Sequence, residues 1–162
     1  SRPTRLAEEC HASLDVLGVR DDRRTVFRYP VRKLSYHRQD VLENMVQLGQ
    51  EIAPEWVVIP SGSDLHQDHA TIHDEALRAF KHKTVLGYEL PWNHITFCAS
   101  AFVTLERRHL DRKWDALTCY ASQLELGRPY FTKEFHESLA RVRGLQVKND
   151  WAEAFELIRV VL

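Results

Sequence analysis

Apolar positions recur along the chain with two different spacings. In some stretches they return every three or four residues, the period of an amphipathic helix; these are residues 5–17, 35–52, 67–80, 111–124 and 132–143. Shorter apolar or β-branched runs are typical of buried strands; these are residues 25–29, 56–59, 85–88, 101–105 and 155–161. Because helices and strands alternate, the pattern predicts an α/β fold whose mainly parallel sheet is flanked by helices.

The composition narrows the class of protein without naming a function. The chain has 162 residues, of which 44% are hydrophobic and 28% charged, so we expect one globular domain over residues 1–162. A net charge of −1 gives no basic excess for binding nucleic acid. No apolar stretch is long enough to span a membrane and no signal peptide is evident, which favours a cytoplasmic protein. Three widely spaced cysteines indicate free thiols rather than a disulfide framework.

The chemistry-bearing residues gather in one short segment, Asp64-Leu65-His66-Gln67-Asp68-His69, directly after the strand at residues 56–59. Ligands bind at the ends of such strands in open α/β sheets. His66 and His69 are three positions apart and share a helix face, and Asp68 could orient an imidazole by accepting its ring N–H. Imidazole and carboxylate groups are ligands for zinc, although histidines at a helix start can equally be surface or capping residues.

Several patches in the same order resemble the LmbE-like (PIG-L) family of zinc-dependent de-N-acetylases. Besides the motif just described, the helix beginning Arg5-x-x-Glu8 and the segment 113–123, which ends in Ser122-Gln123, are similar to family helices. Residues 87–93 resemble one bacterial branch associated with surface-polysaccharide genes. The resemblance implies a Rossmann-like fold and a zinc-dependent hydrolase that removes the acetyl group from an N-acetylated amino sugar.

The resemblance also assigns roles at the metal. It makes His69 a zinc ligand, and it makes His66, oriented by Asp68, the group that stabilises the oxyanion or protonates the leaving amine. General acid–base help of this kind is worth about 10²–10⁴-fold in rate. His73 lies on the same helix face as His69, but the family pattern does not use it, and a hydrogen-bonded or solvent-facing histidine is the simpler interpretation.

Substrate contacts follow from the same resemblance. Arg5 matches a position that contacts substrate, although pairing with Glu8 or Glu9 on the helix surface is an equally plain interpretation. Trp92 and Asn93 could hold a sugar ring, with core packing of Trp92 as the alternative. The expected partner is a small N-acetylated sugar, and a homo-oligomer is compatible with the sequence.

One departure from the family is clear. Its first metal motif, His-Pro-Asp-Asp, follows the first strand and supplies two zinc ligands and the base. That motif is absent, and the chain opens directly on the helix at Arg5. We therefore expect an N-terminally incomplete domain that lacks its first strand, either a fragment or a natural short form. A catalytically inactive sugar-binding or scaffolding relative is the alternative. A phosphoesterase is weaker, because few carboxylates lie at suitable spacing for two metals.

Overall fold

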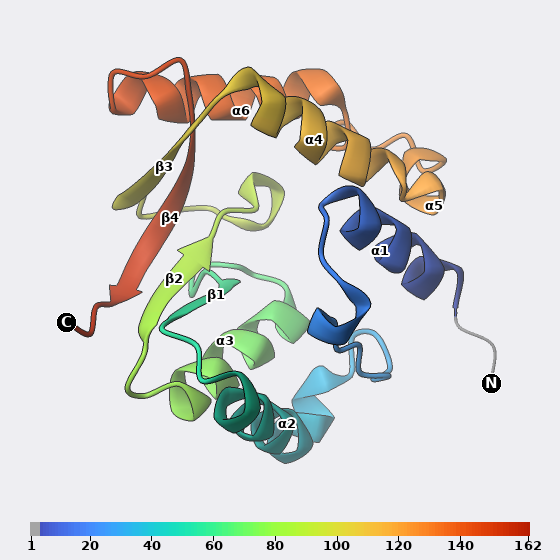
Figure 1. Cartoon of the computed structure of the whole chain (residues 1–162), viewed down its shortest axis with the longest axis vertical. Helices are drawn as coiled ribbons and strands as arrows, with labels where there is room; N and C mark the ends of the chain where they lie inside the picture. The colour runs from blue at the N-terminus through green and yellow to red at the C-terminus, as the bar shows by residue number, and fades with distance from the viewer. Residues whose placement is uncertain (1–3) are drawn as a thin grey trace. The chain divides into compact units, whose positions relative to one another are not determined.

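The computed structural model describes residues 4–162, which form two compact units (Figure 1). One unit comprises the chain up to Phe27 together with Val103–Glu153, and the other comprises Arg28–Phe102 with Ala154–Leu162. The α/β class predicted from the sequence is confirmed. The expectation of a single domain over residues 1–162 stays a prediction.

The unit that contains the histidine motif is built around three strands. Strand β1 (Trp56–Pro60) runs parallel to β2 (Thr84–Tyr88), with Val58 opposite Leu86. Strand β4 (Trp151–Arg159) runs antiparallel to β2, and the full strand order is β1-β2-β4-β3, with β3 at Ala101–Leu105. The sheet is therefore mixed, whereas the sequence pattern favoured mainly parallel pairing.

Helices α2 (Arg38–Ile52) and α3 (Gln67–Ala79) lie side by side in this unit, and α3 also packs against β1 (Figure 1). A small apolar core forms where the inward faces meet; it consists of Ile59, Ala76 and Val85, with Met45, Val57, Leu77, Phe80 and Ile158 packed around it. Short 3-10 turns η2 (Leu34–His37) and η3 (Pro91–Asn93) complete the described elements of this unit.

The other unit is mainly helical. It contains α1 (Arg5–Val16), the turn η1 (Asp21–Arg23), α4 (Arg107–Thr118), α5 (Ala121–Leu124) and α6 (Lys133–Gln146). Threonine hydroxyls cap two of these helices: Thr4 accepts from the N–H of Ala7, and Thr132 from that of Phe135. The helix predicted at residues 132–143 continues to Gln146, so Gly144 lies inside it, where a Cβ would meet the Asn149 carbonyl oxygen at 2.7 Å.

The strand predicted at residues 25–29 does not form, and residues 24–30 have no regular structure. Val26 and Phe27 are 47% and 44% exposed, so this segment is not the buried strand that its apolar residues predicted. Local β-propensity is weak without a neighbouring strand to supply hydrogen bonds and packing. The single helix predicted from residue 111 to 124 is instead two, because the chain leaves helical geometry at Tyr120.

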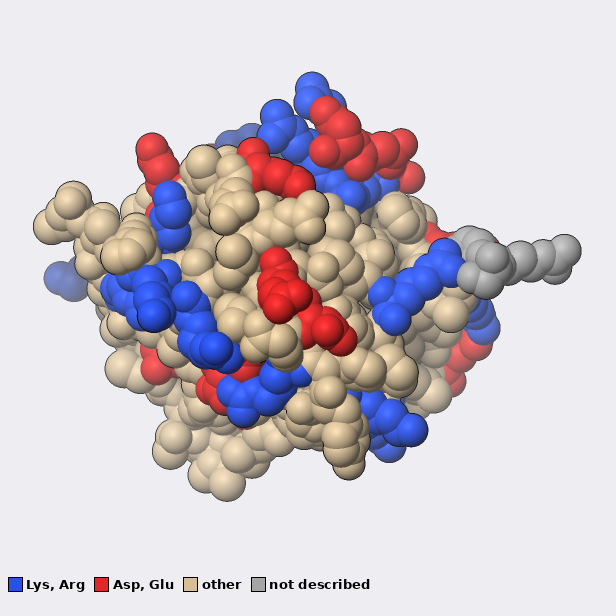
Figure 2. Space-filling view, turned by 90° about the horizontal axis from the view of Figure 1, so that it is seen from below, with Lys and Arg blue, Asp and Glu red and all other residues tan. Residues whose placement is uncertain are grey.

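Two further observations bear on partners. None of the helices within residues 4–162 combines the length and the apolar character that crossing a bilayer requires. On the face drawn in Figure 2, acidic and basic side chains alternate with uncharged surface rather than forming a field of one sign.

Candidate active site

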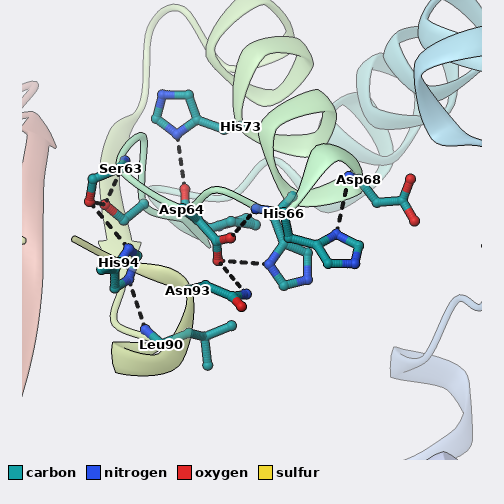
Figure 3. A network of polar contacts seen from close by, with 11 residues as sticks. Ser63, Asp64, His66, Asp68, His73, Leu90, Asn93 and His94 are labelled. Carbon is teal, nitrogen blue, oxygen red and sulfur yellow. Dashed lines mark hydrogen bonds and ion pairs between the residues drawn. The ribbon is translucent and has the colours of Figure 1, made fainter. Parts of the chain in front are cut away.

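The histidine motif lies where β1 ends and α3 begins (Figure 3). The chain turns immediately after Pro60, and the backbone N–H of Asp64 donates to the Ser61 carbonyl across the turn, 3.1 Å away. This turn places the Asp64 side chain beneath the first residues of α3, where only 1% of it is exposed. His66 is the N-cap of the helix. Strand end, turn and helix start therefore bring the polar residues of the motif together.

The buried carboxylate of Asp64 is the centre of the site. Its Oδ2 atom lies 2.7 Å from Nδ1 of His69 and 3.3 Å from the side-chain nitrogen of Asn93, while Oδ1 accepts from the backbone N–H of His66 at 2.8 Å. Burial by itself raises the pKa of Asp64, but the bonds from His69, His66 and Asn93 together outweigh it, so the pKa is lowered. Asp64 is therefore an ionised acceptor for three donors.

These contacts fix which nitrogen of each histidine carries the proton. Because the Asp64 carboxylate only accepts, the neutral His69 ring holds its proton on Nδ1 and leaves the Nε2 lone pair free. The backbone N–H of Asp68 donates to Nδ1 of His66 at 3.2 Å, so the proton of that neutral ring is on Nε2. The ring centroids are 4.6 Å apart. The two rings thus offer complementary groups side by side, one a lone pair and the other an N–H donor.

Asp68 contacts His66 through its backbone rather than its side chain. Its carboxylate accepts from the backbone N–H of Arg32 at 2.6 Å and of Leu34 at 3.2 Å, and in Figure 3 it points away from the His66 ring. The expected arrangement, in which the Asp68 carboxylate orients an imidazole, is found instead at Asp64 and His69. At the second position of α3 the Asp68 side chain projects outward, toward the loop in which Arg32 has a φ of 65°.

Asn93 and Trp92 both belong to the turn η3. The Asn93 carbonyl accepts from the backbone N–H of Leu65 at 3.0 Å and its amide donates to Asp64, so this residue faces the site. Trp92 is 39% exposed, which places it at the surface of the same turn rather than in the core.

Arg5 lies in the helical unit. Its guanidinium contacts Glu9 at 3.2 Å and Glu125 at 2.5 Å, and the hydrogen bond with Glu125 is the main reason that the pKa of Arg5 is raised. Glu9 in turn accepts from the backbone N–H and the hydroxyl of Ser122, at 2.8 and 2.5 Å. The surface pairing that the sequence left open as an alternative is therefore present.

Four residues of this neighbourhood were not anticipated from the sequence: Ser61, Ser63, His94 and Glu156. The only local signal for them is the turn-forming stretch after β1, because Glu156 comes from the far end of the chain. His73, considered above as a possible ligand, donates from Nδ1 to the Pro60 carbonyl at 2.9 Å. It is thus a hydrogen-bonded residue of the helix.

A complete zinc site does not fit into the part of the chain that the structure describes. Within residues 4–162 no group of three or more histidine, cysteine, aspartate or glutamate side chains is placed to bind a metal. His69 offers one free nitrogen, and Asp64 is engaged in orienting it. Catalytic zinc normally has three protein ligands. What the structure shows here is one imidazole nitrogen without a partner among residues 4–162, on a ring that the Asp64 carboxylate holds in place.

Comparison with known proteins shows a similarity between the first half of the chain and one protein family. Residues 3–80 match the family model of PIG-L, described as GlcNAc-PI de-N-acetylase. This part of the chain is similar to the PIG-L family. The matched PIG-L segment contains the whole run from Asp64 to His69 and ends at the last turn of α3. No curated protein matches the sequence at a significant level.

Solved structures share the fold of the PIG-L segment and of the rest of the chain. The conserved protein TT1542 from Thermus thermophilus has a TM-score of 0.81 at 21% identity, over 100% of this chain and 76% of that one. The 4-carboxy-2-hydroxymuconate hydratase GalB from Pseudomonas putida has 0.69 at 20%, over 98% and 72%. The N,N'-diacetylchitobiose deacetylase from Pyrococcus horikoshii has 0.70 at 18%, over 94% and 62%. Since a hydratase and a deacetylase share this architecture, these likenesses establish the fold and not the reaction.

Proposed function

We propose that this protein hydrolyses the N-acetyl group of an N-acetylated amino sugar, of the N-acetylglucosamine type, in glycoconjugate or surface-polysaccharide synthesis. Water adds to the acetamide carbonyl, the carbon–nitrogen bond breaks, and acetate and a free amine leave. The observation that carries the proposal is the Asp64–His69 pair with the His66 ring beside it, within a segment that matches a GlcNAc-PI de-N-acetylase family.

His66 has the proton that this reaction needs. Its Nε2–H is left free by the bond that Asp68 makes to Nδ1, so it can donate to the carbonyl oxygen as negative charge develops there. The same N–H can pass its proton to the amine as the carbon–nitrogen bond breaks. We assign His66 the role of acid, and Asp68 the role of holding its ring through the backbone.

We propose zinc as the metal, with Nε2 of His69 as one ligand. Imidazole whose other nitrogen donates to a carboxylate is a common arrangement at zinc, since the carboxylate fixes the tautomer and raises ligand basicity. The further ligands would have to come from groups outside residues 4–162. Asn93 and Trp92 are proposed to contact the sugar from the turn η3, and Arg5 remains a proposed substrate contact.

The test is acetate release by the full-length protein from N-acetylglucosamine and from its nucleotide- and lipid-linked forms, with and without added zinc. A His69→Ala variant should lose release, while His82→Ala, which changes an exposed histidine of the same unit, should retain it. The alternative, a non-catalytic sugar-binding relative, is favoured by the incomplete ligand set among the described residues. It predicts that the protein binds the same sugars without releasing acetate, and that His69→Ala leaves this binding unchanged.

A further inference from the structure

A second polar network lies behind the candidate site and connects strand β4 to the turn η3. Ser61, which is 1% exposed, donates from its hydroxyl to Oε2 of Glu156 at 2.6 Å. Its Oγ lies 3.0 Å from Oγ of Ser63, which in turn lies 3.3 Å from Nδ1 of His94. The backbone N–H of Leu90 donates to Nε2 of His94 at 2.9 Å (Figure 3).

The proton positions in this network can be worked out from either end. At one end, the Leu90 N–H occupies Nε2 of His94, so the neutral ring has its proton on Nδ1 and donates to Ser63. At the other end, Glu156 Oε2 is a carboxylate oxygen and can only accept. It accepts from the Gly62 N–H and from the Ser61 hydroxyl, so the Ser61 proton points to Glu156. Each hydroxyl has one proton, so Ser63 must donate to Ser61 and accept from His94. Both derivations give the same direction.

This direction has a chemical consequence. A serine nucleophile requires a neighbouring histidine that accepts its proton, whereas His94 donates to Ser63. The pair is therefore not a serine-hydrolase dyad. Hydrogen bonds aligned in one direction and ending at a carboxylate strengthen one another, which makes the network a rigid tie.

The network depends on a close approach between strand β2 and the turn after β1. A Cβ atom on Gly87 would lie 2.9 Å from Cα of Ser61 and 3.3 Å from Oε2 of Glu156, so only glycine permits this approach between β2 and the turn after β1. At the other end, His94 immediately follows Asn93, whose amide donates to Asp64 and whose carbonyl accepts from Leu65. The network thus fixes the turn that holds Asp64.

We propose that His94 is a positioning residue: through Leu90 and the Ser63–Ser61–Glu156 chain it fixes the turn 90–94, so that Asn93 holds Asp64 against His69. His94 touches neither the free nitrogen of His69 nor the ring N–H of His66, and it acts through Asn93. The geometry stands on its own, but the catalytic purpose of the positioning rests on the proposed function.

The experiment is nitrogen–proton NMR of the histidine rings in the full-length protein, which reports the ring proton of each histidine without substrate. Wild type should show the proton of His94 on Nδ1. Ser63→Ala removes the His94 acceptor and should speed solvent exchange of the His69 Nδ1–H by about threefold to tenfold, as expected for the loss of one hydrogen bond. Ser63→Thr keeps the hydroxyl and should restore the wild-type rate, and His82→Gln should change neither.

A wild-type His94 that has its proton on Nε2 would overturn the proposal, even if Ser63→Ala does not fold. It would also be overturned if Ser63→Ala alters the His94 signals but leaves His69 exchange unchanged. The deacetylase assay is read separately. If the NMR results are as expected but no acetate is released, the proposed function is contradicted. If acetate is released but Ser63→Ala leaves the exchange rate of the His69 Nδ1–H unchanged, only the positioning role is contradicted.

Discussion

The carboxylate of Asp64 and Nδ1 of His69 lie 2.7 Å apart at the start of helix α3, with the carboxylate buried and the imidazole partly exposed. This contact fixes the tautomer of the partly exposed His69 ring and leaves the lone pair of its Nε2 atom available. The same carboxylate also accepts from the backbone of His66 and from the amide of Asn93. Stability and function are therefore linked at Asp64.

Asp64→Ala should destabilise the fold by about 1–3 kcal/mol, because it leaves three donors without an acceptor in a buried place. The measurement is urea unfolding at neutral pH. Asp74→Ala, at a residue of helix α3 whose side chain is 54% exposed, is the control and should change the free energy of unfolding by less than about 0.5 kcal/mol. Equal effects of the two substitutions would show that Asp64 does not organise the site.

His66→Asn separates the capping role of His66 from its chemical role. Asparagine is a good N-cap, so the helix should keep its start and the melting temperature should change little. Loss of the imidazole N–H should lower kcat for acetate release by about 10²–10⁴-fold with a small change in KM. Steady-state kinetics together with thermal unfolding test this. A variant with wild-type kcat would remove His66 from the proposed mechanism.

Glu75 is fully buried and contacts Arg38 and Arg78, each at 2.5 Å. Burial raises its pKa, but the bonds from the two arginines outweigh burial and the pKa is lowered below its usual 4.5. Glu75→Gln should destabilise the fold at pH 7 by about 2 kcal/mol, the scale of a charged hydrogen bond. A carboxyl with a lowered pKa stabilises above its unfolded value and loses that contribution in acid. The difference between wild type and variant should thus shrink below about pH 4.5 in unfolding curves.

His136 should make the stability of the fold depend on pH in a different range. Burial and the nearby Lys113 lower its pKa to about 4, against the opposing effect of Glu153, and its Nε2 has no hydrogen-bond partner within residues 4–162. The unfolded chain takes up a proton near pH 6.5 and the folded one only near pH 4. Stability should therefore decline as the pH falls from 6.5 to 4. His136→Leu should flatten that decline, and an unchanged slope would contradict the assignment.

The spacing of apolar residues correctly predicted helices and strands whose formation depends mainly on residues close together in the sequence. The apolar stripe that predicts a helix at 67–80 corresponds to α3 at Gln67–Ala79, and the run 101–105 coincides with β3. The failed strand at 25–29 shows the limit, because a strand depends on a partner that sequence periodicity does not report. The antiparallel direction of β4 was missed for the same reason.

The sequence predicted which polar residues of the motif lie close together, but not which of them form hydrogen bonds with one another. The spacing of His66 and His69 indicated a shared helix face, and their proximity in the structure agrees with it. Which carboxylate orients which ring could not be read from the sequence, because Asp64 and Asp68 each lie two positions from His66 and both are within five positions of His69. The tie to Glu156 spans 95 positions of sequence, so only the folded sheet reveals it.

The most direct test of the account is acetate release from N-acetylglucosamine-type sugars by the full-length protein and by its His69→Ala variant, both supplied with zinc. The account predicts release by the wild type and a loss of at least about a hundredfold in kcat/KM when the His69 nitrogen is removed. Equal rates for the two proteins, or no acetate release by the wild type from any of these sugars, would contradict it.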